Sequence, residues 1–233
     1  MLAEHEIHLW SSGIFKPEAI LRALYRKLSP DEREKAARFR FDRDRNAYIV
    51  ARGLLRSILS HYVGIEPEQL QFTYGPKGKP ALRGSHLYFN ASHSKDLAVY
   101  ALSLEPQLGI DVEYIRPITT LEAIAKQFFS AVEYDDLLTL NTSQRCEGFF
   151  NCWTRKEAYV KAIGDGLYAP LHEFQVTVKP DQPASFVTIQ GDQTLAARWS
   201  LFDLKLGEQY SGAIAVYGRG WHLEERSVAV IGL

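Results

Sequence analysis

The segment that most constrains the fold is residues 149–166, FFNCWTRKEAYVKAIGDG. Apolar residues recur in it at helical spacing, and Gly164 and Gly166 follow the last of them. This period predicts an amphipathic helix, and the glycines predict its end. Glu157 and Lys161 are one turn apart and fall side by side on one flank of the apolar stripe. The segment therefore predicts a helix that presents a carboxylate and an ammonium group together.

Lys156 lies in the middle of the apolar stripe of the same helix. A lysine there needs a route to solvent or an anionic partner, because an unpaired buried charge is costly. An ordinary surface pair between Glu157 and Lys161, with a snorkelling Lys156, would explain the pattern equally well. The helix alone therefore does not establish a functional site.

The composition is that of an ordinary globular protein. The chain has 233 residues, of which 46% are hydrophobic and 24% charged, enough for one large domain or two small ones. We see neither a secretion signal nor an apolar run of membrane-spanning length, so we expect a cytoplasmic protein with no membrane partner. Cys146 and Cys152 have no partner pair elsewhere, and we expect both to be free thiols.

The charge is unevenly distributed along the chain. Residues 1–100 carry 16 basic and 11 acidic side chains, whereas residues 101–233 carry 11 basic and 17 acidic ones. A basic half beside an acidic half suits a site where a polyanionic ligand meets a metal ion held by carboxylates. A nucleic-acid-binding protein would be more basic overall, so we expect no nucleic acid as partner.

The first part of the chain is predicted to be mainly helical. Residues 6–10 alternate like a short strand, and residues 17–28 and 46–63 have helical periodicity. Ser29 to Glu32 reads as a capping box with a proline at the first helical position. Three arginines, Arg45, Arg52 and Arg56, stack on the polar side of the last helix, where a solvated row is the more common arrangement.

The period then changes to two, which predicts a small, mainly antiparallel sheet formed by residues 71–74, 86–90, 97–104 and 109–115. Lys77 and Lys79 project from the glycine-rich and proline-rich loop at residues 75–80, which is either a ligand-binding loop or a solvated turn. A group of polar side chains, Asn90, Ser92 and His93, ends one of the strands, where binding residues are often found.

The second part of the chain repeats the order of helices followed by a sheet. A helix is expected at residues 120–129, and Ser130 to Glu133 forms another capping box. Beyond the central helix, strands are expected at residues 174–178, 185–190, 196–204 and 211–218.

Two acidic residues on the last strand of the first sheet decide the functional interpretation. Asp111 and Glu113 point to the same face of the strand, about 6 to 7 Å apart, while Ile110 and Val112 point to the other face. Mg²⁺ prefers oxygen ligands and is commonly held by a few carboxylates together with substrate phosphates. With Glu157 as a third ligand, these residues predict a magnesium site.

The pairing of GIDVE with WTRKEAYVK some forty residues later resembles the signature of the 4′-phosphopantetheinyl transferases, specifically the larger Sfp-type members. The resemblance extends to SPDEREKAARFRF, KGKP, FNASHS and the FFS-x-x-EY segment, and it fades after about Pro170. It implies an α+β fold that is a pseudo-dimer of two similar halves, which we place at residues 1–108 and 109–233. A monomer is expected, since both halves lie in one chain.

The resemblance also implies which residues bind the substrate, coenzyme A. Asp111, Glu113 and Glu157 would hold Mg²⁺ on its pyrophosphate. The residues that would bind its phosphates are Lys35, Lys77, Lys79, Asn90, Ser92, His93 and Lys161. This chain has Glu32 and Ala47 where some members have basic residues. Arg45 or Arg52 would therefore bind the 3′-phosphate instead.

The implied reaction transfers the 4′-phosphopantetheine arm of coenzyme A to a serine of an apo acyl or peptidyl carrier protein, with release of 3′,5′-ADP. Lys161 would stabilise the leaving oxygen, and Glu157, or else Glu113, would act as the base. The carrier would dock on residues 164–190 through apolar residues such as Leu167, Tyr168 and Leu171. Two alternatives remain, namely another Mg²⁺-dependent phosphotransferase or phosphohydrolase and a non-catalytic binding module.

Overall fold

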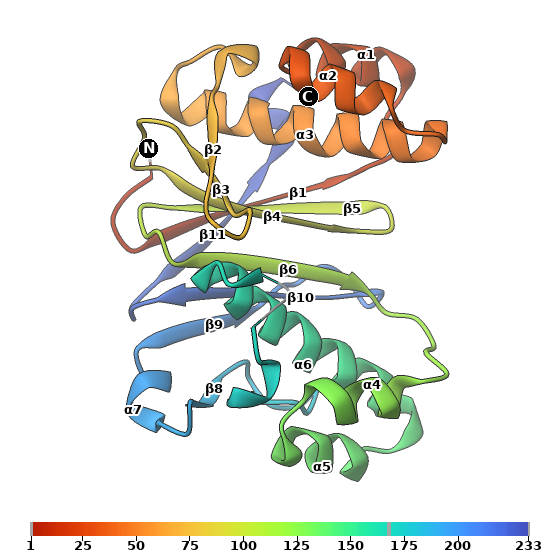
Figure 1. The fold of residues 1–233 in the computed structure, drawn as a ribbon, viewed down its shortest axis with the longest axis vertical. Coiled ribbons are helices and arrows are strands. Elements are labelled where there is room, and N and C mark those ends of the chain that lie inside the picture. Colours follow the sequence, from red (N-terminus) through yellow and green to blue (C-terminus); the bar gives the residue numbers. More distant parts are fainter. Residues whose placement is uncertain (1, 167–168, 233) are drawn as a thin grey trace.

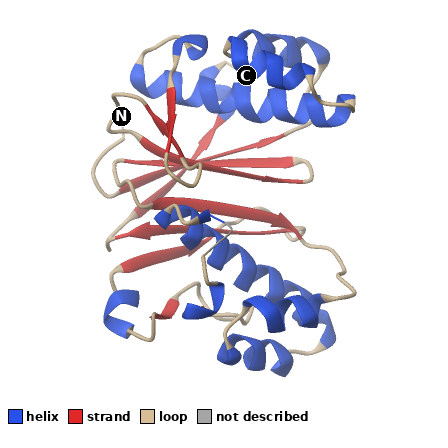
Figure 2. Cartoon of the chain, viewed as in Figure 1, coloured by secondary structure: helices blue, strands red, loops and turns tan. Residues whose placement is uncertain are grey.

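The computed structural model describes residues 2–166 and 169–232 of the chain. Two β-sheets face each other at the centre of the molecule, and helices cover the outer face of each sheet (Figures 1 and 2). The α-helices between residues 18 and 63 cover one sheet, and those between residues 121 and 163 cover the other. The predicted α+β fold with two halves is confirmed.

Three helices cover the first sheet: α1 (Glu18–Arg26), α2 (Pro30–Ala37) and α3 (Asp42–Val63). The predicted capping box is present, since the Ser29 amide donates to Glu32 Oε2 at 3.2 Å. Helix α3 begins four residues earlier than predicted and ends where Gly64 adopts a left-handed conformation with φ of 67°. A single 3₁₀ turn, η1 (Pro67–Gln69), follows α3.

The first sheet has the strand order β11-β1-β5-β4. Strand β1 (Glu6–Gly13) pairs antiparallel with β5 (Leu97–Ser103), which forms a hairpin with β4 (Tyr88–Ser94). Strand β11 (His222–Ser227), which lies near the other end of the described chain, pairs in parallel with β1. The second half of the chain therefore completes the sheet of the first half.

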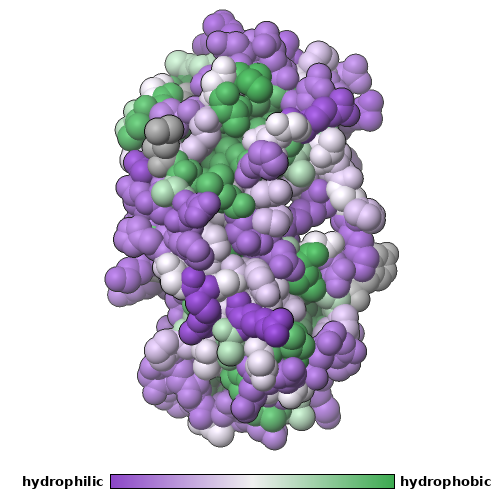
Figure 3. All heavy atoms as spheres, turned by 90° about the vertical axis from the view of Figure 1, so that its left-hand side faces the viewer, coloured by the Kyte–Doolittle hydropathy of each residue, from purple (hydrophilic) through white to green (hydrophobic). Residues whose placement is uncertain are grey.

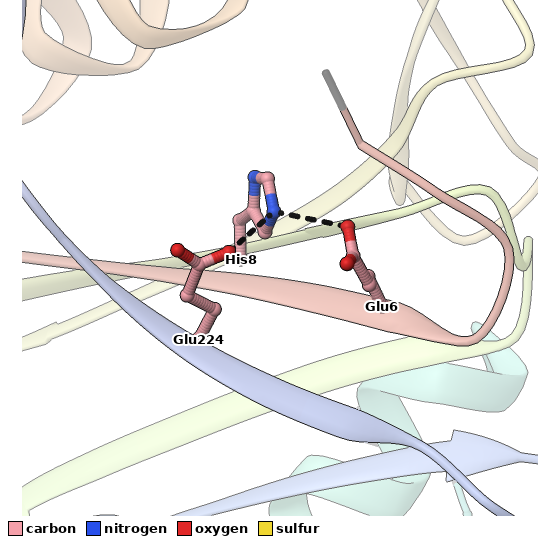
Figure 4. Close-up of side chains that lie close together, drawn as sticks. All are labelled: Glu6, His8 and Glu224. Atoms are coloured by element: carbon pink, nitrogen blue, oxygen red, sulfur yellow. Dashed lines mark ion pairs between the residues drawn. The ribbon is translucent and has the colours of Figure 1, made fainter.

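A buried histidine helps to hold β11 against β1 (Figure 4). His8 Nε2 lies 3.5 Å from Glu6 Oε2 and 3.3 Å from Glu224 Oε2, and its Nδ1 lies 2.6 Å from the hydroxyl of Tyr62 on α3. Arg226 donates to the Glu224 carboxylate at 2.7 Å. Burial lowers the pKa of His8, because the charged imidazole loses hydration. The cluster links β1, β11 and α3.

The second sheet has the order β6-β10-β9, with β6 (Leu108–Tyr114), β9 (Trp199–Asp203) and β10 (Tyr210–Tyr217) all antiparallel to their neighbours. Helices α4 (Leu121–Phe128), α5 (Ala131–Thr139) and α6 (Thr142–Ile163) cover it. Helix α6 begins seven residues before the predicted start, because Asn141 caps it by accepting from the Gln144 amide at 3.0 Å.

Shorter elements complete the two halves. They are the hairpin of β2 (Phe72–Tyr74) and β3 (Pro80–Leu82), the hairpin of β7 (Phe174–Val176) and β8 (Phe186–Ile189), α7 (Gln193–Ala196), and the 3₁₀ turns η3 (Leu171–Glu173) and η4 (Val228–Ile231). The strand predicted to begin at Ala196 begins at Trp199 instead. Asp192 caps α7 by accepting hydrogen bonds from the Thr194 and Leu195 amides. Ala196 is the last residue of this short helix and is therefore not part of the strand.

Buried apolar side chains form one cluster under each helical layer and a third cluster between the two sheets. Ile110 and Val112 of β6 belong to the cluster between the sheets. Because side chains alternate along a strand, Asp111 and Glu113 face the opposite side, toward α6. Strand β6 is therefore covered on both faces, and its acidic face meets the central helix.

One face of the molecule is predominantly polar (Figure 3). Figure 3 shows one face, on which hydrophilic side chains predominate and apolar ones gather mainly over the half that contains α1 to α3. Cys146 and Cys152 are both free, as predicted. None of the helices in the described ranges combines the length and the apolar character needed to cross a membrane.

Candidate active site

The central helix α6 lies directly on strand β6, because β6 has a glycine at the crossing. A Cβ atom on Gly109 would lie 2.1 Å from the Ala158 carbonyl oxygen and 2.4 Å from the Ala162 amide nitrogen. Any larger residue would therefore displace the helix backbone. This close approach brings the flank of α6 that carries Glu157 and Lys161 onto the acidic face of β6.

Lys156, which lies in the apolar stripe of α6, is not part of this flank. Its side chain is fully buried, and its ammonium group pairs with Glu133 at 2.8 Å. The same ammonium donates to the carbonyl oxygens of Leu171 and Phe174 at 2.7 and 2.6 Å. The anionic partner that the sequence required is therefore Glu133, which the sequence placed in a capping box. Lys156 fastens α6 to α5 and to the segment that follows α6.

Lys161 and Asp111 form the centre of the candidate site. Lys161 Nζ lies 2.6 Å from Asp111 Oδ1 and donates to Ser92 Oγ at 3.0 Å. Ser92 in turn donates to the same Asp111 oxygen at 2.9 Å. The other oxygen of this buried carboxylate, Oδ2, has no hydrogen-bond partner. Asp111 Oδ1 thus has two partners, whereas Oδ2 could still accept a bond from a ligand.

Glu113 and Glu157 add two carboxylates beside Asp111. Ser94 donates to Glu113 Oε2 at 2.8 Å. Burial raises the pKa of Glu157, and the negative charges of Asp111 and Glu113 raise it further while Lys161 opposes them. Three carboxylates therefore share one region with a single lysine, and an additional cation would relieve their mutual repulsion.

The donor set fits a hard divalent cation. All three side chains offer carboxylate oxygens, which Mg²⁺ prefers, and the buried Asp111 Oδ2 has no hydrogen-bond partner that would compete with an ion. Within the described residues, however, only Glu6, His8 and Glu224 offer three ligand atoms that all lie within 4.8 Å of one another. Arg226 already pairs with Glu224 in that cluster. The convergence of Asp111, Glu113 and Glu157 on one ion stays a prediction.

The two lysines of the loop between β2 and β3 have partners within the protein. Lys77 pairs with Asp165 at 3.3 Å. Lys79 donates to three backbone carbonyl groups, those of Ala162, Leu108 and Pro106, at 2.7, 3.0 and 3.2 Å. Burial lowers the pKa of Lys79 to about 8. In this structure Lys79 joins the loop to β6 and to the end of α6, which is a structural contact that the sequence did not predict.

A cavity of about 380 Å³ opens beside Ser92 and contains part of the predicted phosphate-binding set. Its polar walls include Ser92, His93 and Arg52, and its aromatic walls are Phe39, Tyr48 and Tyr100. The aromatic residues were not predicted, because they come from separate elements and leave no local pattern.

The other predicted phosphate-binding residues are not among those that line this cavity. The Lys35 ammonium lies 5.3 Å from the ring centroid of Tyr48, and Arg45 is partly exposed and pairs with Asp42 at 3.1 Å. Asn90 is buried and accepts from the Ile110 amide at 3.0 Å. Of this set, Ser92 alone contacts Lys161 and Asp111 directly.

Two arginines of the α3 row, Arg52 and Arg56, are largely withdrawn from solvent, contrary to the arrangement that the sequence favoured, whereas Arg45 stays partly exposed. Glu32 is buried and binds both Arg52 and Arg56, the latter at 2.5 Å. Arg56 also donates to the Pro67 and Leu70 carbonyls. Burial alone would raise the pKa of Glu32, but the two guanidinium groups outweigh it, and the pKa lies below its usual value. Glu32 therefore sets the orientation of Arg52 at the edge of the cavity.

We expect Glu32→Gln to lower the free energy of unfolding by about 3 kcal/mol at neutral pH, because it removes the carboxylate from a buried pair. The pKa of Glu32 is lower in the folded state than its ordinary 4.5, so its stabilising effect is complete above pH 4.5 and is lost as the pH falls further. Urea unfolding over this range should show the two proteins converging in acid. A constant difference would contradict the assignment.

One predicted docking residue is not available at the surface. Leu171 is buried and belongs to the apolar cluster under α4 to α6. Leu171 begins the 3₁₀ turn η3, and its own carbonyl oxygen accepts a hydrogen bond from buried Lys156, which explains the burial. Leu167 and Tyr168 lie outside the described residues.

Comparisons with known proteins match both halves of the chain to the same kind of protein. The family model described as the 4′-phosphopantetheinyl transferase superfamily matches residues 107–215, and the one described as 4′-phosphopantetheinyl transferase, N-terminal, matches residues 16–105. The 4′-phosphopantetheinyl transferase HetI of Nostoc sp. is 43% identical over 94% of this chain and 91% of its own. The 4′-phosphopantetheinyl transferase Sfp of Bacillus subtilis is 35% identical over 68% of this chain and 70% of its own.

Proposed function

This chain belongs to the 4′-phosphopantetheinyl transferase superfamily, and we propose that it transfers the phosphopantetheine arm of coenzyme A to a serine of an apo acyl or peptidyl carrier protein. The observation that carries the proposal is the contact of Lys161 with Asp111 and Ser92, which joins α6, β6 and β4 at one point. The protein would act in the cytoplasm as a monomer.

Coenzyme A would bind with its phosphates near Ser92 and His93, at the cavity beside β4. Mg²⁺, held by Asp111, Glu113 and Glu157, would neutralise the charge of the pyrophosphate. Phosphoryl transfer depends mainly on positioning and charge neutralisation, which suits a site that is built at the meeting of three elements. Lys161 would stabilise negative charge on the leaving oxygen.

In the proposed reaction the serine oxygen of the carrier forms a bond to the β-phosphorus of coenzyme A. The bridging P–O bond breaks, and 3′,5′-ADP leaves with the bonding electrons. Glu157 is our candidate for the base that accepts the hydroxyl proton. Asp111 and Glu113 are each held by a serine hydroxyl, whereas no described residue donates a hydrogen bond to the Glu157 carboxylate. Glu113 is the second candidate.

The test is to incubate the protein with coenzyme A, Mg²⁺ and a panel of apo carrier proteins and to measure the mass of each carrier. The expected result is a gain of one phosphopantetheine on at least one carrier. Asp111→Ala and Glu157→Ala should each lower the rate at least about 100-fold, since even outer-shell partners of a metal commonly contribute 10- to 100-fold. Glu147→Ala, an exposed acid on the same helix, is the matched control.

Two other outcomes would overturn the proposal. Hydrolysis of coenzyme A with no change in carrier mass would indicate a phosphohydrolase. Binding of coenzyme A or of a carrier without any turnover would indicate a non-catalytic module. Comparing the rates of modification across the panel of apo carrier proteins also identifies the carrier that the enzyme prefers.

A further inference from the structure

Strand β4 is joined to strand β6 by side chains, although the two strands belong to different sheets. Three alternate side chains of β4 accept hydrogen bonds from three alternate amides of β6. The pairs are Asn90 with Ile110 at 3.0 Å, Ser92 with Val112 at 3.4 Å, and Ser94 with Tyr114 at 3.1 Å. The side chains thus replace the backbone ladder that would otherwise connect neighbouring strands.

The two serines of this ladder have a second bond each. Ser92 Oγ donates to Asp111 Oδ1 at 2.9 Å, and Ser94 Oγ donates to Glu113 Oε2 at 2.8 Å. A hydroxyl group can donate one hydrogen bond and accept others at the same time. Each serine therefore fixes the β6 backbone and a carboxylate of the candidate metal site with a single oxygen atom.

The two carboxylates depend on their serines to different degrees. Asp111 is also held by Lys161, at 2.6 Å. Among the described residues, Ser94 alone donates a hydrogen bond to the Glu113 carboxylate. Glu113 is only partly buried, so without this bond its side chain would have several rotamers open to it.

Ser94 is itself held in place by the tip of the β4–β5 hairpin. Lys95 lies over the ring of Tyr114, with its ammonium 3.5 Å from the ring centroid. The Asp96 carboxylate accepts a hydrogen bond from the Tyr210 hydroxyl, and the rings of Tyr114 and Tyr210 pack edge to face. Contacts from the hairpin tip to β6 and β10 thus restrict the movement of Ser94 relative to Glu113.

We propose that Ser94 is a positioning residue that orients Glu113 for binding a divalent cation, an inference that rests on the proposed function. The first half of the chain then sets the geometry of carboxylates that belong to the second half. Ser94 does not touch the reacting atoms; its hydroxyl selects the rotamer of Glu113 and leaves Oε1 free for the ion.

The test measures metal binding directly, with Mn²⁺ as the probe in place of Mg²⁺. Free Mn²⁺ is titrated by electron paramagnetic resonance in the presence of coenzyme A, with a protein-free titration to subtract the ion that coenzyme A binds. We expect Ser94→Ala to weaken Mn²⁺ binding about 10-fold, the lower end of the effect of removing an outer-shell partner. Ser94→Thr, which keeps the hydroxyl, should bind within about threefold of the unaltered protein.

Ser12→Ala is the matched control, because Ser12 is a buried serine of the same sheet whose hydroxyl donates to the neighbouring carbonyl of Gly13. It should bind Mn²⁺ as the unaltered protein does. Equal affinities for Ser94→Ala and the unaltered protein would overturn the inference, as would a Ser94→Thr variant as weak as Ser94→Ala. Absence of Mn²⁺ binding by the unaltered protein would also overturn it. Mn²⁺ binding without carrier modification would instead refute the proposed function alone.

Discussion

Replacing Lys156 by methionine is expected to lower the free energy of unfolding by about 3 to 5 kcal/mol, the usual cost of breaking a buried ion pair. The substitution keeps the volume and apolar stem of the side chain but leaves the carboxylate of Glu133 buried without its cation. It also removes the donor to the Leu171 and Phe174 carbonyls. Urea unfolding followed by circular dichroism measures the effect.

Lys126→Met is the control for this prediction, since Lys126 lies exposed on α4. Its stability should stay within about 0.5 kcal/mol of the unaltered protein. A double substitution that also replaces Glu133 by leucine should recover part of the loss, because a well-packed apolar pair can replace a buried ion pair. Recovery would be incomplete, since Glu133 also accepts from the amides of Ser130 and Val176. A Lys156→Met protein as stable as the control would refute this account of the core.

Replacing Gly109 by alanine is expected to reduce both stability and transfer activity. The new Cβ atom would overlap the backbone of α6 at Ala158 and Ala162, and a helix backbone cannot move aside as a flexible side chain can. We expect a loss of about 3 kcal/mol or more in the free energy of unfolding. Because the displaced helix carries Glu157 and Lys161, we also expect a fall of about 100-fold in the transfer rate of the folded fraction.

The control is Gly13→Ala on strand β1, where the nearest atom to a new Cβ would be the Asp96 carbonyl oxygen at 3.8 Å, an ordinary contact. Both variants add one methyl group to a strand glycine with no positive φ angle. Thermal unfolding and the carrier-mass assay should therefore separate them clearly. Equal behaviour of the two variants would mean that α6 does not rest on Gly109 as tightly as the structure indicates.

The parts of the fold that could be predicted from the sequence have local signals. The apolar stripe of α6, the capping boxes at Ser29 and Ser130 and the alternation of β6 all depend on residues within a few positions of one another. The need of Lys156 for an anion was also visible, since it follows from one charged residue in an apolar stripe. These signals were enough to predict helices followed by strands in each part of the chain, but not which sheet each strand joins: β6, expected in the first sheet, pairs with β10 in the second.

The parts that could not be predicted depend on contacts between distant residues. Strand β11 is largely polar, has no regular alternation of exposed and covered residues, and its partner lies some 215 residues earlier, so neither propensity nor periodicity identifies it. Glu32 looked like a loss of positive charge near a phosphate, whereas it binds two arginines of α3. The contacts of the Lys79 ammonium with the carbonyl groups of Pro106, Leu108 and Ala162 likewise have no local signal in the sequence.

The parallel pairing of β11 with β1 has a consequence for synthesis on the ribosome. Strand β1 is made before its neighbour β11, and some 215 residues of the chain separate the two. Domains commonly begin to fold while translation continues, from the N-terminal end. One edge of β1 must therefore stay unpaired until residues 222–227 leave the exit tunnel, and the nascent chain carries an open strand edge during that interval.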